Sequence, residues 1–306
     1  MIVVAGDALV DLIVRADGSL VAVPGGGPYN AARAIARLGV PVSWLGGLST
    51  DRFGRDLEAG LVADGVSLEL VQRTELPTTL ALAELGADGA ATYRFYTEGT
   101  SAPAVHPGPL EAGLPAGTRA VHAGTLGFVL EPMATTLEAL VVAMPADTLL
   151  MVDPNCRPSI IGDADAYRVR IARLLARADI VKVSGDDLSY LRLDSTAAEA
   201  MAWLASLGRG VILLTDGADK VRVRVDGAAH DVPVPAIDVV DTVGAGDTFG
   251  GALLACLVHE GRGRGDLTSE AVLRATRFAI RASAIACTRA GADPPTLAEL
   301  GGWPAA

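Results

Sequence analysis

Short apolar runs alternate with stretches of helical periodicity along most of the chain. The runs at residues 2–5, 42–45, 120–123, 148–153, 179–184 and 211–214 are rich in aliphatic residues, and each ends at glycine or polar residues. Because these runs are apolar nearly throughout, they are typical of strands buried on both faces. Helices are predicted near residues 31–38, 51–65, 131–144 and 163–178. The alternation predicts a three-layer α/β fold, with a mostly parallel central sheet flanked by helices.

Two segments depart from this alternation. Residues 12–14 and 19–23 flank a turn at 16–18, and residues 79–85 and 90–96 flank a turn at 86–89. Each pair predicts an antiparallel hairpin, which we expect to lie outside a parallel sheet. Together the hairpins predict a small antiparallel sheet built from two insertions. The predicted division is a large domain at 1–11, 24–77 and 98–306, with the small sheet at 12–23 and 78–97.

Charge and composition exclude several classes of function. The 306 residues carry a net charge of −11, and we expect such an acidic surface to avoid nucleic acid and anionic membranes. Three scattered cysteines and four scattered histidines support neither a disulfide framework nor a zinc site. No basic segment precedes the first apolar run, and no apolar run approaches the roughly 18 residues of a membrane span. We therefore expect a cytoplasmic protein.

Two common nucleotide-binding motifs are absent from the sequence. The only lysines are Lys182 and Lys220, and neither belongs to a Gly-Lys-Ser/Thr step, so a Walker-type phosphate loop is excluded. The first predicted strand is followed by Gly6 and Asp7 rather than by Gly-x-Gly-x-x-Gly. This counts against a dinucleotide-dependent dehydrogenase, the natural rival for an α/β chain of this size.

A glycine-rich stretch at residues 239–251 carries the strongest chemical signal. Gly244, Ala245 and Gly246 lie where an extended segment turns into an apolar helix. Backbone N–H groups at such a helix start form an anion cradle. Asp247 would repel a bound anion unless it had its own task, such as accepting a proton from an attacking hydroxyl group. The alternative is a tight turn whose Asp247 only caps the helix.

The residues Asp-Thr-x-Gly-Ala-Gly-Asp-x-Phe at 241–249 resemble the second signature of the PfkB, or ribokinase-like, carbohydrate kinases. The segment at 24–32 resembles their first signature, Gly-Gly-x-x-x-Asn-x-Ala. The resemblance covers nearly the whole chain and implies a ribokinase-like fold in which the small sheet is a lid over the sugar. It implies that Asp247 is the catalytic base, that Gly244, Ala245 and Gly246 form the anion hole, and that Gly25, Gly26 and Asn30 bind the sugar.

Further sugar-binding candidates lie near the predicted small sheet. Asp11 follows the first strand, where its carboxylate could accept hydrogen bonds from two hydroxyl groups, and the matching aspartate of the family binds the sugar. A solvated loop acid is the alternative. Tyr93 and Phe95 are candidates to face the ligand from the second hairpin, although strand aromatics more often serve packing.

The segment Asp-Pro-Asn-Cys-Arg-Pro at 153–158 resembles a motif of fructokinases and 2-keto-3-deoxygluconate kinases. It makes Arg157 a candidate clamp on the transferring phosphate. Ser184 and Asp187 stand where the family shows Asn-x-x-Glu, so Asp187 is a candidate for holding hydrated Mg²⁺. The resemblance further implies nucleotide contacts from Ser184, Thr215, Gly217, Gly244, Gly246 and the region of Ile280, and a monovalent-cation site, with K⁺ as the candidate, at Asp241.

The function implied is transfer of the γ-phosphoryl group of ATP, with Mg²⁺, to a sugar hydroxyl group. The motifs favour fructose. A 2-keto-3-deoxygluconate kinase is the alternative, with Arg94 as a candidate partner for the substrate carboxylate, and ribokinase or nucleoside kinase activity also stays open. A sugar-binding protein without turnover is the rival from another class, and it would have lost the base or the cradle. The family resemblance also implies a homodimer through the lid.

Overall fold

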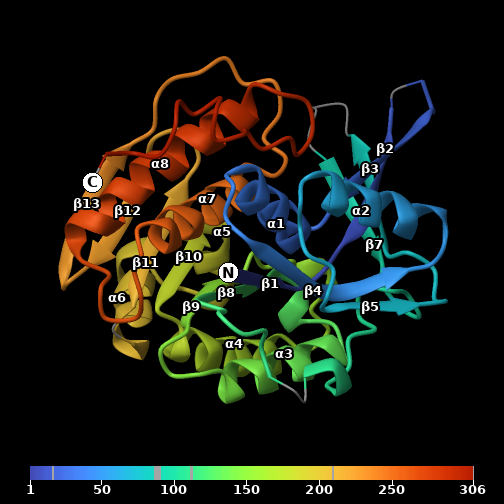
Figure 1. Ribbon diagram of the computed structural model, residues 1–306, viewed down its shortest axis with the longest axis horizontal. Coiled ribbons are helices and arrows are strands. Elements are labelled where there is room, and N and C mark those ends of the chain that lie inside the picture. The colour runs from blue at the N-terminus through green and yellow to red at the C-terminus, as the bar shows by residue number, and fades with distance from the viewer. Residues whose placement is uncertain (16, 86–90, 111–112, 209, 306) are drawn as a thin grey trace.

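The computed structural model describes residues 1–306 except 16, 86–90, 111–112, 209 and 306. Within this described part, a nine-stranded sheet forms the centre of the molecule (Figure 1). In pairing order its strands are β13 (Ala228–Pro233), β12 (Lys220–Val225), β11 (Val211–Asp216), β10 (Ile180–Ser184), β9 (Leu149–Asp153), β8 (Ala120–Gly124), β1 (Ile2–Ala5), β4 (Val42–Ser49) and β5 (Val71–Thr74). The strands from β11 to β5 pair in parallel, and β12 and β13 add an antiparallel edge.

Helices cover both faces of this sheet. Two separate apolar clusters on its two faces hold them there. One cluster joins the sheet to α1 (Gly27–Arg37), α2 (Arg52–Ala63), α7 (Ala245–His259) and α8 (Ser269–Cys287). The other joins it to α3 (Met133–Ala143), α4 (Ala164–Arg177), α5 (Gly185–Leu191) and α6 (Ala197–Leu207). The predicted three-layer α/β fold is confirmed.

A second sheet of four strands forms the lid. Its order is β3 (Leu20–Gly25), β2 (Leu9–Val14), β6 (Leu80–Leu85) and β7 (Ala91–Tyr96). Both predicted hairpins are present as antiparallel pairs, but β2 and β6 join them in parallel. The lid is therefore a mixed sheet, and the prediction of a purely antiparallel one is wrong. The predicted turn at 86–89 and residue 16 lie outside the described residues, and the domain boundaries stay a prediction.

Two local predictions differ from the structure. β4 does not stop at Gly46 and Gly47 but continues to Ser49. A Cβ atom at Gly46 would collide with the Trp44 ring, and one at Gly47 would collide with the carbonyl oxygen of Ser101. These glycines therefore serve close packing rather than a turn. Similarly, Asp11 lies inside lid strand β2 rather than in a loop.

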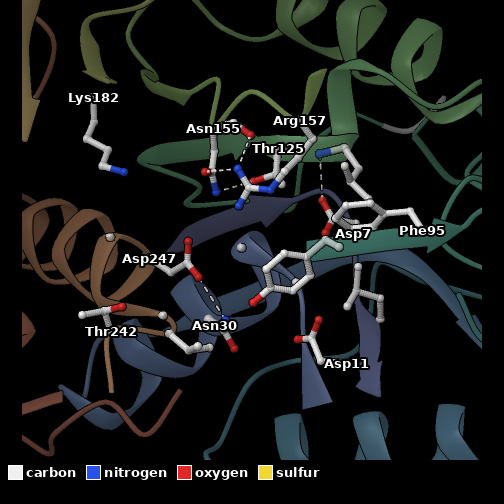
Figure 2. Close-up of a pocket in the computed structure, with 18 residues that line it drawn as sticks. Asp7, Asp11, Asn30, Phe95, Thr125, Asn155, Arg157, Lys182, Thr242 and Asp247 are labelled. Carbon is white, nitrogen blue, oxygen red and sulfur yellow. Dashed lines mark hydrogen bonds between the residues drawn. The ribbon is translucent and has the colours of Figure 1, made fainter. Parts of the chain in front are cut away.

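The parallel strands bring their carboxyl ends to one edge of the sheet. The segments after β1, β8, β9 and β10 begin there with Gly6, Thr125, Pro154 and Gly185, and ligands of open α/β sheets bind at this edge. The lid strands and the first turns of α1 and α7 reach the same edge (Figure 2). No helix in the described part of the chain is both long enough and apolar enough to cross a membrane.

Candidate active site

A cavity of about 450 Å³ lies between the sheet edge, the lid and the starts of α1 and α7. Figure 2 shows that its labelled side chains come from segments far apart in the sequence. The loop after β1, both lid hairpins, the loops after β8 and β9, and β10 all contribute. Its lining residues are Asp7, Leu9, Asp11, Gly26, Gly27, Asn30, Tyr93, Phe95, Thr125, Leu126, Asn155, Arg157, Lys182, Thr242, Val243, Gly244, Gly246 and Asp247.

The amino terminus of α7 forms one wall of this cavity. Gly244 caps the helix with φ = 73°, and a Cβ atom there would lie 2.6 Å from Cβ of Ala292. Both facts require glycine at this position. The N–H of Ala245 already donates to the Thr242 carbonyl oxygen at 3.2 Å. Gly244 and Gly246 line the cavity, whereas Ala245 is not part of its lining. The helix start thus presents backbone and positive dipole to the cavity.

Asp247, in the first turn of α7, points into the cavity beside Asn30. Nδ2 of Asn30 donates to Oδ2 of Asp247 at 3.0 Å. Burial raises the pKa of Asp247, whereas the Asn30 hydrogen bond and the charges of Lys182 and Arg157 lower it, and the net change is upward. A raised pKa brings a carboxylate closer to the range of a useful general base. Gly27 keeps this space open, because a Cβ atom there would lie 3.1 Å from Oδ1 of Asp247.

Two more carboxylates, Asp7 and Asp11, occupy the side of the cavity near the lid (Figure 2). Oδ1 of Asp7 accepts from the N–H of Leu126 at 3.1 Å. Burial raises the pKa of Asp7 to about 7 and that of Asp11 to about 6. A Cβ atom at Gly25 would collide with Oδ2 of Asp11, so Gly25 makes room for this carboxylate although it does not line the cavity.

The lid closes this side with two aromatic rings. Tyr93 and Phe95 are two residues apart on β7, so both rings lie on the face of the strand that is turned to the cavity, and their centroids lie 6.2 Å apart. Leu9 and Leu126 add aliphatic surface to the same wall. The acceptor side therefore combines acidic groups with apolar faces.

The loop after β9 presents Arg157 to the cavity. Its Nη1 donates to Oδ1 of Asn155 at 2.6 Å and to the carbonyl oxygens of Asn155 at 3.0 Å and Cys156 at 3.2 Å. Nδ2 of Asn155 in turn lies 3.4 Å from Oγ1 of Thr125. These contacts fix the guanidinium group, and its remaining N–H groups are available to an anion.

Sequence reasoning missed Lys182 and Asp153. Lys182 lies in β10 and Asp153 at the end of the neighbouring β9, and Nζ of Lys182 donates to Oδ2 of Asp153 at 2.8 Å. Each side chain is only 6% exposed. The signal was available, because a lysine inside the apolar run Ile-Val-Lys-Val requires a buried partner. Asp7 could equally have been predicted, because it is an acid two residues after a buried strand.

Apart from Gly244 and Gly246, the predicted nucleotide and metal residues lie outside the cavity lining. Ser184 and Thr215 are neighbours in the β10–β11 register. Asp187 accepts through Oδ2 from the Ser184 N–H and hydroxyl groups at 2.8 and 2.7 Å, and through Oδ1 from the Cys156 N–H at 2.6 Å. Both of its oxygens are thus used in protein contacts. Gly217 adopts φ = 57° after β11, and Ile280 is buried on α8.

Asp241 ties two loops together. Its Oδ1 accepts from the N–H of Val243 at 3.0 Å and its Oδ2 from the N–H of Gly291 at 2.8 Å. Among the residues that the structure describes, no cluster of three or more His, Cys, Asp or Glu side chains is arranged to hold a metal ion. The roles of Asp187 and Asp241 stay predictions.

Comparison with known proteins gives a consistent result. The profile of the family described as pfkB family carbohydrate kinase matches residues 1–299. A fructokinase of Rhizobium leguminosarum bv. trifolii is 34% identical over 261 residues, which cover 84% of this chain and 79% of the relative.

Two solved structures agree with this assignment. The fructokinase of Xylella fastidiosa with bound ATP superposes with a TM-score of 0.89 at 27% identity, covering 98% of this chain and 96% of that one. The aminoimidazole riboside kinase of Salmonella enterica, complexed with aminoimidazole riboside and an ATP analog, has a TM-score of 0.84 at 27% identity, covering 98% of each chain.

Proposed function

The chain belongs to the pfkB family of carbohydrate kinases, and we propose that it transfers the γ-phosphoryl group of ATP to a hydroxymethyl group of fructose. The fructokinase relatives support the acceptor, and the ATP-bound fructokinase structure supports the donor. The observation that carries the proposal is the pairing of Asp247 at the start of α7 with Asp7 and Asp11 on the lid side of the same cavity. Carboxylates accept hydrogen bonds from the hydroxyl groups of a neutral sugar.

In the proposed mechanism, Asp247 accepts the proton of the sugar hydroxyl group. The sugar oxygen forms the new bond to the γ-phosphorus as the bond to the bridging oxygen breaks, and ADP leaves with that electron pair. Asn30 orients Asp247 through its 3.0 Å hydrogen bond. The N–H groups at Gly244 and Gly246 and the guanidinium group of Arg157 stabilise the developing negative charge. Closure of the lid would exclude water, which competes with the sugar as acceptor.

Magnesium enters this scheme as part of the substrate MgATP. Both oxygens of Asp187 already accept hydrogen bonds from the protein, so Asp187 does not fit as a direct ligand. Mg²⁺ commonly retains several waters and binds through substrate phosphates. The residues present therefore suit a metal ion that arrives with the nucleotide. When bound, the metal ion would neutralise phosphate charge. Asp187 would not contact the ion directly, but would hold Ser184 and the turn between β10 and α5 in place.

The acidic acceptor side argues against 2-keto-3-deoxygluconate, whose carboxylate would need a cation there. Arg94 alternates with Tyr93 and Phe95 along β7, is exposed, and therefore points away from the cavity. A riboside is the second candidate substrate. The apolar wall of Leu9, Phe95 and Leu126 suits a planar base, and the aminoimidazole riboside kinase shares the fold over nearly its whole length.

The lid also supports a proposed homodimer. Leu20 and Tyr96 leave 61% and 50% of their surface exposed on the lid strands. The two side chains stand on the two edge strands of the lid, β3 and β7, and exposed apolar side chains on an uncovered sheet favour association with a second copy. Sedimentation of the wild type beside a Leu20→Glu, Tyr96→Glu variant tests this, because the double variant should be monomeric if the lid forms the contact.

Turnover of MgATP with a panel of fructose, ribose, tagatose and aminoimidazole riboside tests the proposed function. The expected result is ADP release with fructose at the highest kcat/KM, and a product whose ³¹P signal couples to a CH₂ group. A higher kcat/KM for the riboside would show that a riboside, and not fructose, is the acceptor. Binding of a sugar without any ADP release would contradict the proposal and favour a protein that only binds sugars.

A further inference from the structure

We propose that Lys182 donates a hydrogen bond to the phosphoryl group in transfer, and that Asp153 positions the lysine ammonium for this contact. The inference adds a catalytic residue to the phosphoryl-transfer reaction. It rests on one part of the proposed function, which is the binding of MgATP in this cavity. It does not depend on which sugar accepts the phosphoryl group.

The geometry places the lysine head group against the anion cradle. A Cβ atom built on Gly246 would lie 2.9 Å from Nζ of Lys182. Lys182 also belongs to the cavity lining, and Figure 2 shows its ammonium end pointing toward the centre of the site, on the same side as Asp247. An anion bound by the N–H groups at the start of α7 would therefore meet the ammonium group as its next neighbour.

The hydrogen bonds of Lys182 are incomplete without a ligand. An ammonium group has three N–H donors. In the described part of the chain, one acceptor is recorded for Nζ, which is Oδ2 of Asp153 at 2.8 Å. The remaining donors belong to a side chain that is 6% exposed, so bulk water satisfies them poorly. A phosphoryl oxygen would supply the missing acceptor, and a charge-assisted hydrogen bond of this kind is among the stronger ones.

The surrounding charges keep Lys182 in its ammonium form. Burial acts to lower its pKa, but Asp153, Asp187 and Asp247 raise the pKa on balance above the ordinary value. A permanent positive charge in a water-poor site stabilises negative charge that develops in the transition state. The sequence has no Walker lysine to contact the phosphates. Lys182, held by Asp153 between β10 and β9, would supply a positive charge to the phosphates in its place.

A purely structural ion pair is the competing explanation. Removing lysine alone does not decide between the two, because it leaves Asp153 buried without a partner and destabilises the fold. Lys182→Met combined with Asp153→Asn removes both charges and preserves approximate volume. If the pair only serves folding, this double variant restores stability and turnover together. If Lys182 acts on the phosphoryl group, stability returns but kcat does not.

The expected result for the double variant is a thermal transition close to that of the wild type, an unchanged KM for the sugar, and kcat lower by about 10²-fold. Lys220 offers a matched control, since it is the other lysine and pairs with Asp231 at 2.6 Å on an exposed sheet edge. Lys220→Met should leave kcat unchanged. A folded double variant with kcat within about threefold of the wild type would overturn the proposal.

A measurement on the wild-type protein keeps the proposal testable if the double variant does not fold. Labelling lysine with ¹⁵N at Nζ gives two signals, and Lys220→Met assigns them. Adding ADP, Mg²⁺ and aluminium fluoride, which imitates the phosphoryl group in transfer, should shift the Lys182 signal well beyond the shift caused by ADP and Mg²⁺ alone. An identical Lys182 signal in both states would overturn the proposal. Absence of fructose turnover by the wild type would instead contradict only the proposed acceptor.

Discussion

The two sides of the cavity differ in charge, although they line the same space of about 450 Å³. The lid side presents Asp7 and Asp11 beside aromatic and aliphatic surface. The α7 side presents a helix amino terminus, Lys182 and Arg157. A neutral polyol suits the first environment and a polyphosphate the second. The difference teaches that the net charge of −11 does not decide what binds, because the local arrangement of a few groups overrides it.

The two sides also differ in how they are built. The α7 side stands on adjacent parallel strands and on a helix whose residues 248–258 are buried. The lid side rests on two hairpins that the β2–β6 pairing joins. We therefore expect substitutions on the α7 side to affect kcat and substitution of Asp11 on the lid side to affect sugar affinity, whereas the fully buried Asp7 should act mainly on stability. The following predictions are ordered from the largest expected effect to the smallest.

Asp247→Asn should cause the largest loss, because it removes the proton acceptor while preserving shape. We expect kcat to fall by about 10³-fold or more, with the KM for fructose changed little. Single-turnover and steady-state kinetics with MgATP measure both quantities. Asn30→Ala, which removes the 3.0 Å hydrogen bond to Asp247, should cause a smaller loss of kcat. If the Asp247→Asn protein kept wild-type turnover, Asp247 would not be the proton acceptor.

Gly244→Ala should be next, because it combines strain at φ = 73° with a contact of 2.6 Å to Cβ of Ala292. We expect about a 10²-fold lower kcat from the displaced N–H groups. Gly39→Ala is the matched control, since Gly39 has φ = 79° but open space around the Cβ position. The control should lose stability and keep kcat. Equal kinetic losses in both variants would contradict a specific role for the cradle.

Asp11→Asn should act mainly on the sugar. Loss of a charged hydrogen-bond acceptor predicts a KM for fructose higher by roughly tenfold to a hundredfold, with a smaller change in kcat. Asp17→Asn is the control on the same hairpin, because Asp17 is exposed, lies outside the cavity lining and accepts from the Ser19 N–H at 2.9 Å. Initial rates over a range of fructose concentrations compare the two. A change in the KM for ATP alone would contradict this prediction, because it would assign Asp11 to nucleotide binding rather than to sugar binding.

Asp7→Asn should have the smallest effect, and it should appear in stability. Burial raises the pKa of folded Asp7 to about 7, while an unfolded aspartate titrates near 3.9. The folded state therefore binds more protons between these values, so wild-type stability falls as pH rises through that range. Relative to the wild type, the variant should gain about 2 kcal/mol between pH 5 and 8. Urea unfolding at both pH values measures this, and a pH-independent difference would contradict it.

The sequence predicted the α7 side better than the lid side. The motif at 241–249 keeps its chemistry within one continuous stretch, so Gly244, Gly246 and Asp247 were found directly, and the structure brings all three to the cavity. The parallel β2–β6 pairing was not predictable, because it joins residues 70 positions apart, as in Val10 and Leu80, and no local pattern encodes it.

The identity of a partner on another strand was equally hidden, although Lys182 inside an apolar run indicated that it needed one. Lys182 and Asp153 meet only because β9 and β10 pair in one register. Arg94, the candidate partner for a substrate carboxylate, is exposed and alternates along β7 with Tyr93 and Phe95. Residues such as Ser184, Asp187, Thr215 and Ile280 lie outside the cavity lining. Their proposed nucleotide or metal roles depend on ligands rather than on contacts within the protein.

The most direct test of the contrast between the two sides is the ratio of kcat/KM for fructose to kcat/KM for 2-keto-3-deoxygluconate in the wild-type protein. Both sugars present a hydroxymethyl group, but only the second carries a carboxylate. The acidic lid side predicts a preference for fructose of about 10²-fold or more, because like charges placed together cost several kcal/mol. Equal or better use of 2-keto-3-deoxygluconate would contradict the account and assign the acceptor side to a charged sugar.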